Sequence, residues 1–230
     1  GHTYGPAFTR YEFVRKDESV KFKKVEGLEK ELSACLHAYS VRVEAPIPKT
    51  NKIGVEAPNE ARYPIPFKSV QSQVPANASP LTVPLGQMVD GKTVFMDLAK
   101  MPHLLIAGTT GSGKSVAVTG IITSLLMRNT PDQLKFSMVD PKQLDLSLFE
   151  GIPHLREDII TETTNAEDML MNAVEEMERR YTLMKNFTKS RVRNITEYNA
   201  VADKKMPYYV IIVDEFSDLR AGLKSSQAGP

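Results

Sequence analysis

The chain has 230 residues, of which 41% are hydrophobic and 25% are charged, and its formal net charge is +1 at pH 7. This composition is typical of a soluble globular protein with one large or two small domains, and it excludes a membrane-embedded or a disordered chain. The charge gives no global sign of a nucleic-acid partner. The single cysteine, Cys35, excludes an internal disulfide and indicates a reducing cytoplasm. We expect Cys35 to be a small buried side chain on a helix.

Residues 1–72 predict a small α/β domain. Residues 8–14 alternate in polarity and are rich in aromatic side chains, which is typical of a strand. Residues 27–39 have leucines at helical spacing, which predicts a helix. Residues 41–45 and 52–56 alternate on either side of a turn, which predicts a β-hairpin.

The polar stretch 73–80 contains two prolines and has no periodicity, so it predicts a linker to a second domain over 81–230. In this second domain, three apolar runs predict buried strands at 104–107, 135–140 and 208–213. Because helical segments separate these runs, we expect a parallel α/β sheet that binds ligands at the carboxyl ends of its strands.

The segment from Thr164 to Glu167 has the spacing of a capping box and predicts the start of a long helix. Apolar residues recur on one face of that helix, and we expect this face to be core. The face consists of Ala166, Met169, Leu170, Ala173, Val174, Met177, Tyr181 and Met184.

Residues 108–115 match every fixed position of the phosphate-binding P-loop pattern. Glycines in such a loop let backbone N–H groups surround phosphate oxygens, and the helix that follows adds the positive end of its dipole. The pattern predicts a site for ATP and Mg²⁺, in which Lys114 reaches the phosphates and Ser115 ligates the metal. The expected nucleotide-binding residues are Gly108, Thr109, Thr110, Gly111, Ser112, Gly113, Lys114, Ser115 and Val116.

Asp214 and Glu215 follow the last apolar strand, about a hundred residues after the P-loop. We expect Asp214 to hold Mg²⁺, directly or through water, together with Ser115. Glu215 is then placed to activate the water that attacks the γ-phosphate. Lys114, Asp214 and Glu215 are thus the expected catalytic residues. Asp140 ends the neighbouring strand and is a weaker candidate, because carboxylates after strands also form turns and caps.

A basic segment without acids covers residues 179–196, from the end of the long helix into the residues after it. Its six cations either contact a phosphate backbone or are simply a helix end followed by a solvated loop, and the second interpretation is favoured because cations belong at helix C-termini. The six are Arg179, Arg180, Lys185, Lys189, Arg191 and Arg193.

Longer motifs resemble the FtsK/SpoIIIE family of bacterial DNA translocases. The matching segments lie at 5–12, 81–86, 97–115, 139–142, 150–155, 177–181, 193–195 and 212–219. The resemblance implies the family's α-domain over 1–72, followed by a RecA-like P-loop ATPase domain. It also implies a motor that assembles as a hexameric ring around double-stranded DNA, moves along it by using ATP in chromosome segregation at division or sporulation, and works at the inner face of the cell membrane.

The resemblance ends near Leu219, and residues 220–230 read as a Gly/Ser/Ala-rich tail. The further strands, arginine finger and pore loops of the family are not recognisable, so we expect an incomplete motor domain that is only weakly active alone. Two alternatives stay open. One is a related motor for secretion or conjugation, and the other is a non-hydrolysing module for nucleotide binding or oligomerisation.

Overall fold

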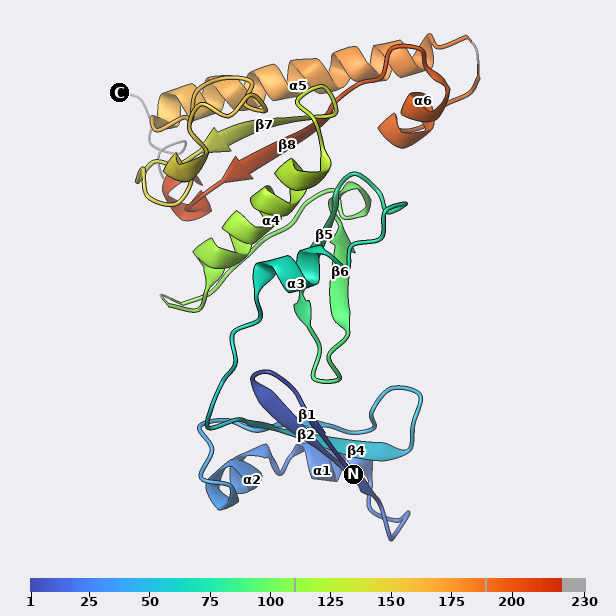
Figure 1. Ribbon diagram of the computed structural model, residues 1–230, viewed down its shortest axis with the longest axis vertical. Coiled ribbons are helices and arrows are strands. Elements are labelled where there is room, and N and C mark those ends of the chain that lie inside the picture. Colours follow the sequence, from blue (N-terminus) through green and yellow to red (C-terminus); the bar gives the residue numbers. More distant parts are fainter. Residues whose placement is uncertain (110, 189, 221–230) are drawn as a thin grey trace, which may run out of the picture. The chain divides into compact units, whose positions relative to one another are not determined.

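The computed structural model describes residues 1–109, 111–188 and 190–220. The chain divides into two units, Gly1–Leu105 and Ile106–Pro230 (Figure 1). The domain boundaries proposed from the sequence, with a linker over 73–80, stay a prediction.

The first unit contains a four-stranded antiparallel sheet with the order β1-β2-β4-β3. The expected strand at 8–14 and the expected hairpin are confirmed, and β1 is an additional edge strand. The strands are β1 (His2–Tyr4), β2 (Phe8–Val14), β3 (Arg42–Glu44) and β4 (Lys52–Pro58).

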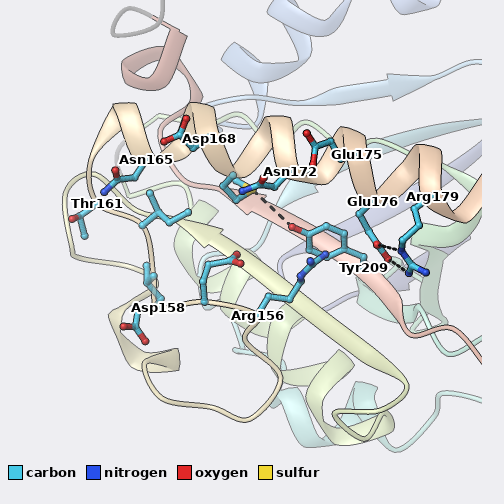
Figure 2. A pocket seen from close by; sticks show the side chains of 14 residues that line it. Arg156, Asp158, Thr161, Asn165, Asp168, Asn172, Glu175, Glu176, Arg179 and Tyr209 are labelled. Atoms are coloured by element: carbon cyan, nitrogen blue, oxygen red, sulfur yellow. Dashed lines mark hydrogen bonds and ion pairs between the residues drawn. The ribbon is translucent and has the colours of Figure 1, made fainter.

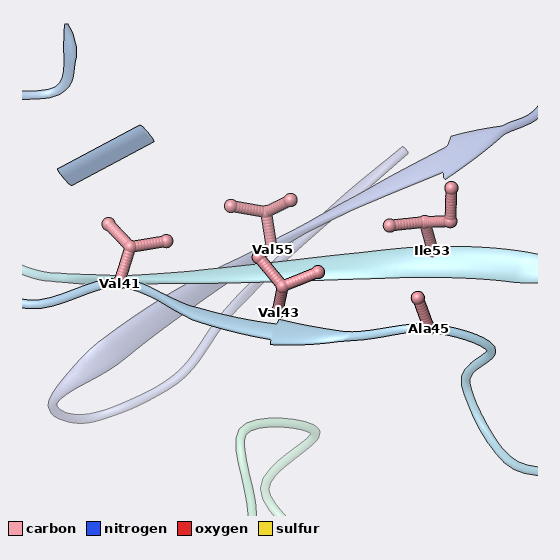
Figure 3. Close-up of a cluster of buried hydrophobic side chains, with 5 residues drawn as sticks. All are labelled: Val41, Val43, Ala45, Ile53 and Val55. Atoms are coloured by element: carbon pink, nitrogen blue, oxygen red, sulfur yellow. The ribbon is translucent and has the colours of Figure 1, made fainter. Parts of the chain in front are cut away.

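Side chains from β3, β4 and the residues next to β3 form the core of this sheet. Val41, Val43, Ala45, Ile53 and Val55 gather into one buried cluster (Figure 3). Two short helices supply further apolar side chains to the cluster. Their bounds are Phe22–Glu26 for α1 and Glu29–Cys35 for α2.

The helix expected over 27–39 is confirmed but is shorter, because Gly27 caps α1 and α2 runs only from Glu29 to Cys35. The expected burial of Cys35 is wrong, since its side chain is exposed. Cys35 is the last residue of the seven-residue α2, and it is Leu32 of this helix that packs against the sheet.

The rest of the first unit consists of an antiparallel hairpin, β5–β6, and two short helices; the sequence analysis did not predict this hairpin. Pro84 and Gly86 interrupt the alternation in its first strand, and a register shift lies between them. The stretch 73–80 contacts this hairpin, because Ser79 Oγ donates to Asp97 Oδ1 at 3.1 Å. The elements are α3 (Phe67–Gln71), β5 (Thr82–Gln87), β6 (Thr93–Asp97) and η1 (Leu98–Lys100).

The second unit is built on two parallel strands, β7 and β8, which pair from Leu134 with Tyr208 to Val139 with Val213. Both expected strands and their parallel direction are thereby confirmed. In Figure 1, α5 runs along one side of this pair and α4 lies on the other. The elements are α4 (Lys114–Arg128), β7 (Leu134–Val139), η2 (Ser147–Phe149), α5 (Thr163–Lys185), α6 (Ile195–Val201) and β8 (Tyr208–Val213).

The structure has no strand at 104–107, so this expectation is wrong. The segment has no regular secondary structure, and the side chains of Leu104 and Leu105 are 42% and 80% exposed. A strand needs a neighbour for its backbone hydrogen bonds, and this segment pairs with no strand in the part of the chain that the structure describes.

The expected long helix is present as α5, but the expected capping box from Thr164 to Glu167 is wrong, because the N-cap residue is Glu162. Glu162 has the extended backbone of an N-cap and makes no side-chain cap, so Thr164 already lies inside the first turn.

Only the beginning of the expected apolar face of α5 is core. Ala166 and Met169 are buried, whereas Val174, Met177 and Tyr181 are exposed. A helix of 23 residues is about 34 Å long, and a strand of six residues spans only about 20 Å. The helix is therefore longer than either strand. No helix in the described ranges is long and apolar enough to cross a membrane.

We expect Leu134→Ala to lower the free energy of unfolding of the second unit by about 2–5 kcal/mol, because the Leu134 side chain is completely buried in β7. Leu148→Ala is the matched control, since Leu148 is 76% exposed, and it should change stability by less than about 0.5 kcal/mol. Urea unfolding measures both variants, and equal losses would contradict this packing.

Candidate nucleotide-binding site

The P-loop leads directly into α4, whose first residue is Lys114. Gly111 and Gly113 have φ angles of 78° and 94°, in the left-handed region that favours glycine. A Cβ atom on Gly108 would collide with the side chain of Ser112. The loop thus requires its glycines, and the first N–H groups of α4, which have no partner within the helix, form a ready anion site. Thr110 lies outside the described residues.

Lys114 lies against the end of β8. Its Nζ donates to Asp214 Oδ1 at 2.6 Å. This hydrogen bond, together with the charges of Asp214, Glu215 and Asp145, raises the pKa of Lys114 above its ordinary value. Two of the expected catalytic residues are thus brought together, and the ammonium stays charged for contact with phosphates.

Ser115 has a partner that the sequence analysis missed. Its Oγ donates to Asp145 Oδ2 at 2.5 Å. Asp145 lies in the loop after β7, five residues beyond Asp140. The rule that ligands bind at the carboxyl ends of parallel strands could have drawn attention to this loop. Val116, the next residue of α4, is 77% exposed.

Asp140 is fully buried at the end of β7. Its Oδ2 accepts a hydrogen bond from the backbone N–H of Leu146 at 3.0 Å. Its Oδ1 has no hydrogen-bond partner among the described residues. Asp140 therefore braces the loop that carries Asp145, which is a structural role at the edge of the site.

Glu215 follows Asp214 with a φ angle of 57°, a strained conformation for a residue with a side chain. Ser217 Oγ donates to its Oε1 at 3.0 Å, and Lys142 Nζ lies 3.3 Å from its Oε2. These two contacts lower the pKa of Glu215, the Ser217 hydrogen bond most, and the contact with Glu215 raises the pKa of Lys142. Glu215 is thus an ionised acceptor at neutral pH.

These residues fit a magnesium–nucleotide complex. In the described ranges, no cluster of three or more His, Cys, Asp or Glu side chains forms a complete metal site. Mg²⁺ does not need one, because it binds through one or two protein oxygens and completes its shell with phosphates and water. The Ser115 hydroxyl and the Asp214 carboxylate supply oxygens of this kind, beside a glycine loop open to anions.

A separate cavity of about 880 Å³ lies between α5 and the loop 156–161 (Figure 2). The guanidinium of Arg156 stacks over the ring of Tyr209 at 4.6 Å, and the Tyr209 hydroxyl lies 2.6 Å from Ser137 Oγ. The lining residues come from 156–179 and Tyr209, so this cavity is distinct from the P-loop.

Glu176 lies at one end of this cavity and binds two arginines of the expected basic segment. Its carboxylate accepts from Arg179 Nε and Arg180 Nε, each at 2.6 Å. These contacts, led by the Arg179 hydrogen bond, lower the pKa of Glu176 to about 2. Arg180 also donates to the carbonyl oxygen of Pro207 at 2.8 Å, which ties α5 to the start of β8. Both arginines therefore have structural partners, whereas Lys185, Arg191 and Arg193 are exposed and Lys189 lies outside the described residues.

Comparison with known proteins shows which family the chain belongs to. Residues 70–227 match the family model of FtsK/SpoIIIE, and residues 1–59 match that of the FtsK alpha domain. The chain belongs to the FtsK/SpoIIIE family. The resemblance inferred from the motifs is thereby confirmed.

Curated relatives in the family are close in sequence. DNA translocase FtsK of Lactiplantibacillus plantarum is 45% identical over 226 residues, which cover 94% of this chain and 28% of the relative. DNA translocase FtsK of Campylobacter jejuni is 43% identical over 221 residues, which cover 94% and 23%. The chain therefore spans about a quarter of the length of these relatives.

Solved structures support the fold. The cytoplasmic domain of the type VII secretion ATPase EccC from Thermomonospora curvata is similar over 70% of this chain and 22% of that one, with a TM-score of 0.56 and 27% identity. The pCW3 conjugation coupling protein TcpA, in a structure with ATPγS, is similar over 95% of this chain and 58% of that one, with a TM-score of 0.50 and 21% identity. Together with the family match, these confirm the expected α/β class and the RecA-like P-loop domain.

We expect Lys114→Ala to weaken the binding of ADP with Mg²⁺ by tenfold or more, because a charge-assisted phosphate contact contributes about 1.5–3 kcal/mol. Isothermal titration calorimetry measures the affinity. Lys204→Ala, at an exposed lysine of the same unit, is the control and should bind normally. Unchanged affinity of Lys114→Ala would rule out this loop as the phosphate site.

We expect Glu176→Gln to lower stability at pH 7 by on the order of 1 kcal/mol, because it removes the charge that binds Arg179 and Arg180. The folded-state pKa of Glu176 is lowered to about 2, so its contribution is complete above the unfolded pKa near 4.5 and is lost as the pH falls toward 2. The urea midpoints of the unmodified chain and of Glu176→Gln, measured at pH 7, 4 and 3, should therefore differ most at pH 7 and approach each other as the pH falls. A difference that does not depend on pH would contradict the ion-pair origin.

Proposed function

We propose that this chain is the nucleotide-binding part of an ATP-driven motor that moves double-stranded DNA. One observation carries the proposal: Lys114 and Ser115 of the P-loop contact two carboxylates, one directly after β8 and the other in the loop after the parallel strand β7. The names of the relatives at 43% to 45% identity support DNA as the substrate.

The residues of the site have separable roles in this proposal. The N–H groups at the start of α4 bind phosphate oxygens, and Lys114 neutralises charge on the β- and γ-phosphates. Ser115 and Asp214 hold Mg²⁺. Bound Mg²⁺ supplies charge neutralisation and orientation at the phosphates.

Glu215 is proposed as the group that takes the proton of the attacking water. A carboxylate with a lowered pKa is ionised and can orient water, and this one also contacts Lys142 and Ser217. Each carboxylate oxygen keeps a lone pair for a water molecule beside these contacts.

The partners follow from the family. We propose that the whole protein forms a hexameric ring around double-stranded DNA and works at the inner face of the cell membrane. Within this chain, the exposed cations Lys185, Arg191 and Arg193 are the candidates for contact with the phosphate backbone.

A motor for secretion or conjugation is the second candidate, because the similar solved structures include a type VII secretion ATPase and a conjugation coupling protein. The lower identity of these structures, 27% and 21%, favours the DNA motor. ATPase assays of the whole protein separate the candidates. Stimulation by double-stranded DNA supports the first, stimulation only by a protein substrate supports the second, and no hydrolysis at all indicates a nucleotide-binding module.

We expect Glu215→Gln in the whole protein to retain ATP affinity and to slow hydrolysis by about 10²–10⁴-fold, the usual effect of losing a general base. Phosphate release under single-turnover conditions measures the rate, and calorimetry measures the affinity. Glu150→Gln, at an exposed glutamate of the same unit, is the control. Turnover near that of the unmodified protein would assign the water-activating role to another carboxylate.

A further inference from the structure

The Ser115 hydroxyl has a chemical requirement that the P-loop pattern does not state. A hydroxyl has one hydrogen to donate and two lone pairs. When it ligates a metal ion through a lone pair, the hydrogen still needs an acceptor, and the direction of the O–H bond decides where the lone pairs point. The acceptor in this structure is Asp145 Oδ2, 2.5 Å from Ser115 Oγ.

Asp214 has a different partner. Its Oδ1 accepts from Lys114 Nζ at 2.6 Å, so the acid expected to accompany Ser115 is paired with the neighbouring lysine. Lys114 and Ser115 thus have one carboxylate each, and the two carboxylates come from loops that follow different strands.

The loop that carries Asp145 is anchored on both sides of this residue. The N–H of Leu146 donates to the buried carboxylate of Asp140, and the Leu146 side chain is only 1% exposed. On the other side, the N–H of Gln143 donates to the carbonyl oxygen of Asp140 at 3.2 Å. The backbone on both sides of Asp145 is therefore anchored, which keeps Asp145 within reach of Ser115.

We propose that Asp145 is a positioning residue for magnesium: it accepts the Ser115 hydrogen and so directs a Ser115 lone pair toward the metal. The inference rests on the proposed binding of magnesium and nucleotide. Partners of this kind orient metal-binding side chains, and removing one typically lowers metal affinity by about 10–100-fold.

The test measures how strongly Mg²⁺ tightens the binding of ADP. Affinities for ADP are determined by calorimetry on the 230-residue chain, once with Mg²⁺ and once with EDTA. We expect Asp145→Ala to reduce the Mg²⁺-dependent gain in affinity by about 10–100-fold and to leave binding in EDTA unchanged. Asp132→Ala, at an exposed aspartate of the same unit, should match the unmodified chain in both conditions.

A second background shows whether Asp145 acts through the hydroxyl. In a Ser115→Ala chain, Asp145→Ala should cause no further loss of the Mg²⁺-dependent gain. Asp145→Asn gives the same comparison if the alanine variant does not fold. Asparagine keeps an acceptor oxygen but loses the charge, so we expect Asp145→Asn to reduce the Mg²⁺-dependent gain in ADP affinity only several-fold. In a Ser115→Ala chain, Asp145→Asn should cause no further reduction.

Three results would overturn the inference. They are an unchanged Mg²⁺-dependent gain in both Asp145 variants, an equal loss in Mg²⁺ and in EDTA, and an undiminished effect of Asp145 in the Ser115→Ala chain. If the unmodified chain binds ADP in neither condition, the proposed function fails as well. Failure of the inference alone leaves normal Mg²⁺-dependent binding in the unmodified chain, so the two failures are distinguishable.

Discussion

The in-register parallel pairing of β7 with β8 is the constraint on which the candidate site depends. Val139 pairs with Val213, and the N–H of Asp214 donates to the carbonyl oxygen of Val139 at 2.9 Å. Both strands therefore end at the same level, and the loops that follow them leave from one edge of the sheet. A shift of this register would move Asp214 away from the loop that begins at Asp140, and the carboxylates could not serve one P-loop.

Short polar contacts join the segments that meet at this edge. Lys114 contacts Asp214, Ser115 contacts Asp145, and Lys142 lies beside Glu215. Each contact pairs a carboxylate with a side-chain donor from another segment. The P-loop is thereby joined to both loops after the strands, and the strained backbone at Glu215 lies beside these contacts.

The long helix α5 is joined to the sheet in two different ways. Near its start, Ala166 and Met169 pack with Val139 and Leu219 in a buried cluster. Farther along, the contact is polar, because Arg180 binds both Glu176 and the carbonyl oxygen of Pro207 just before β8. Val174 and Met177, which lie between these points, remain exposed, so the helix is held at both ends of the sheet while part of its apolar face is open in the described part of the chain.

The sequence by itself determined the local features: β2, the β3–β4 hairpin, β7, β8, the existence of α5 and the P-loop with its glycines. These follow from periodicity and from backbone conformations that only certain residues adopt. Only the tertiary structure decided which side chains meet. It brought Asp145 to Ser115 and placed Lys114 on Asp214. It also left 104–107 outside the sheet and three of the eight residues of the α5 face exposed. The physical reason is that a partner distant along the chain is chosen by packing and strand register, and single-segment patterns contain no information about either.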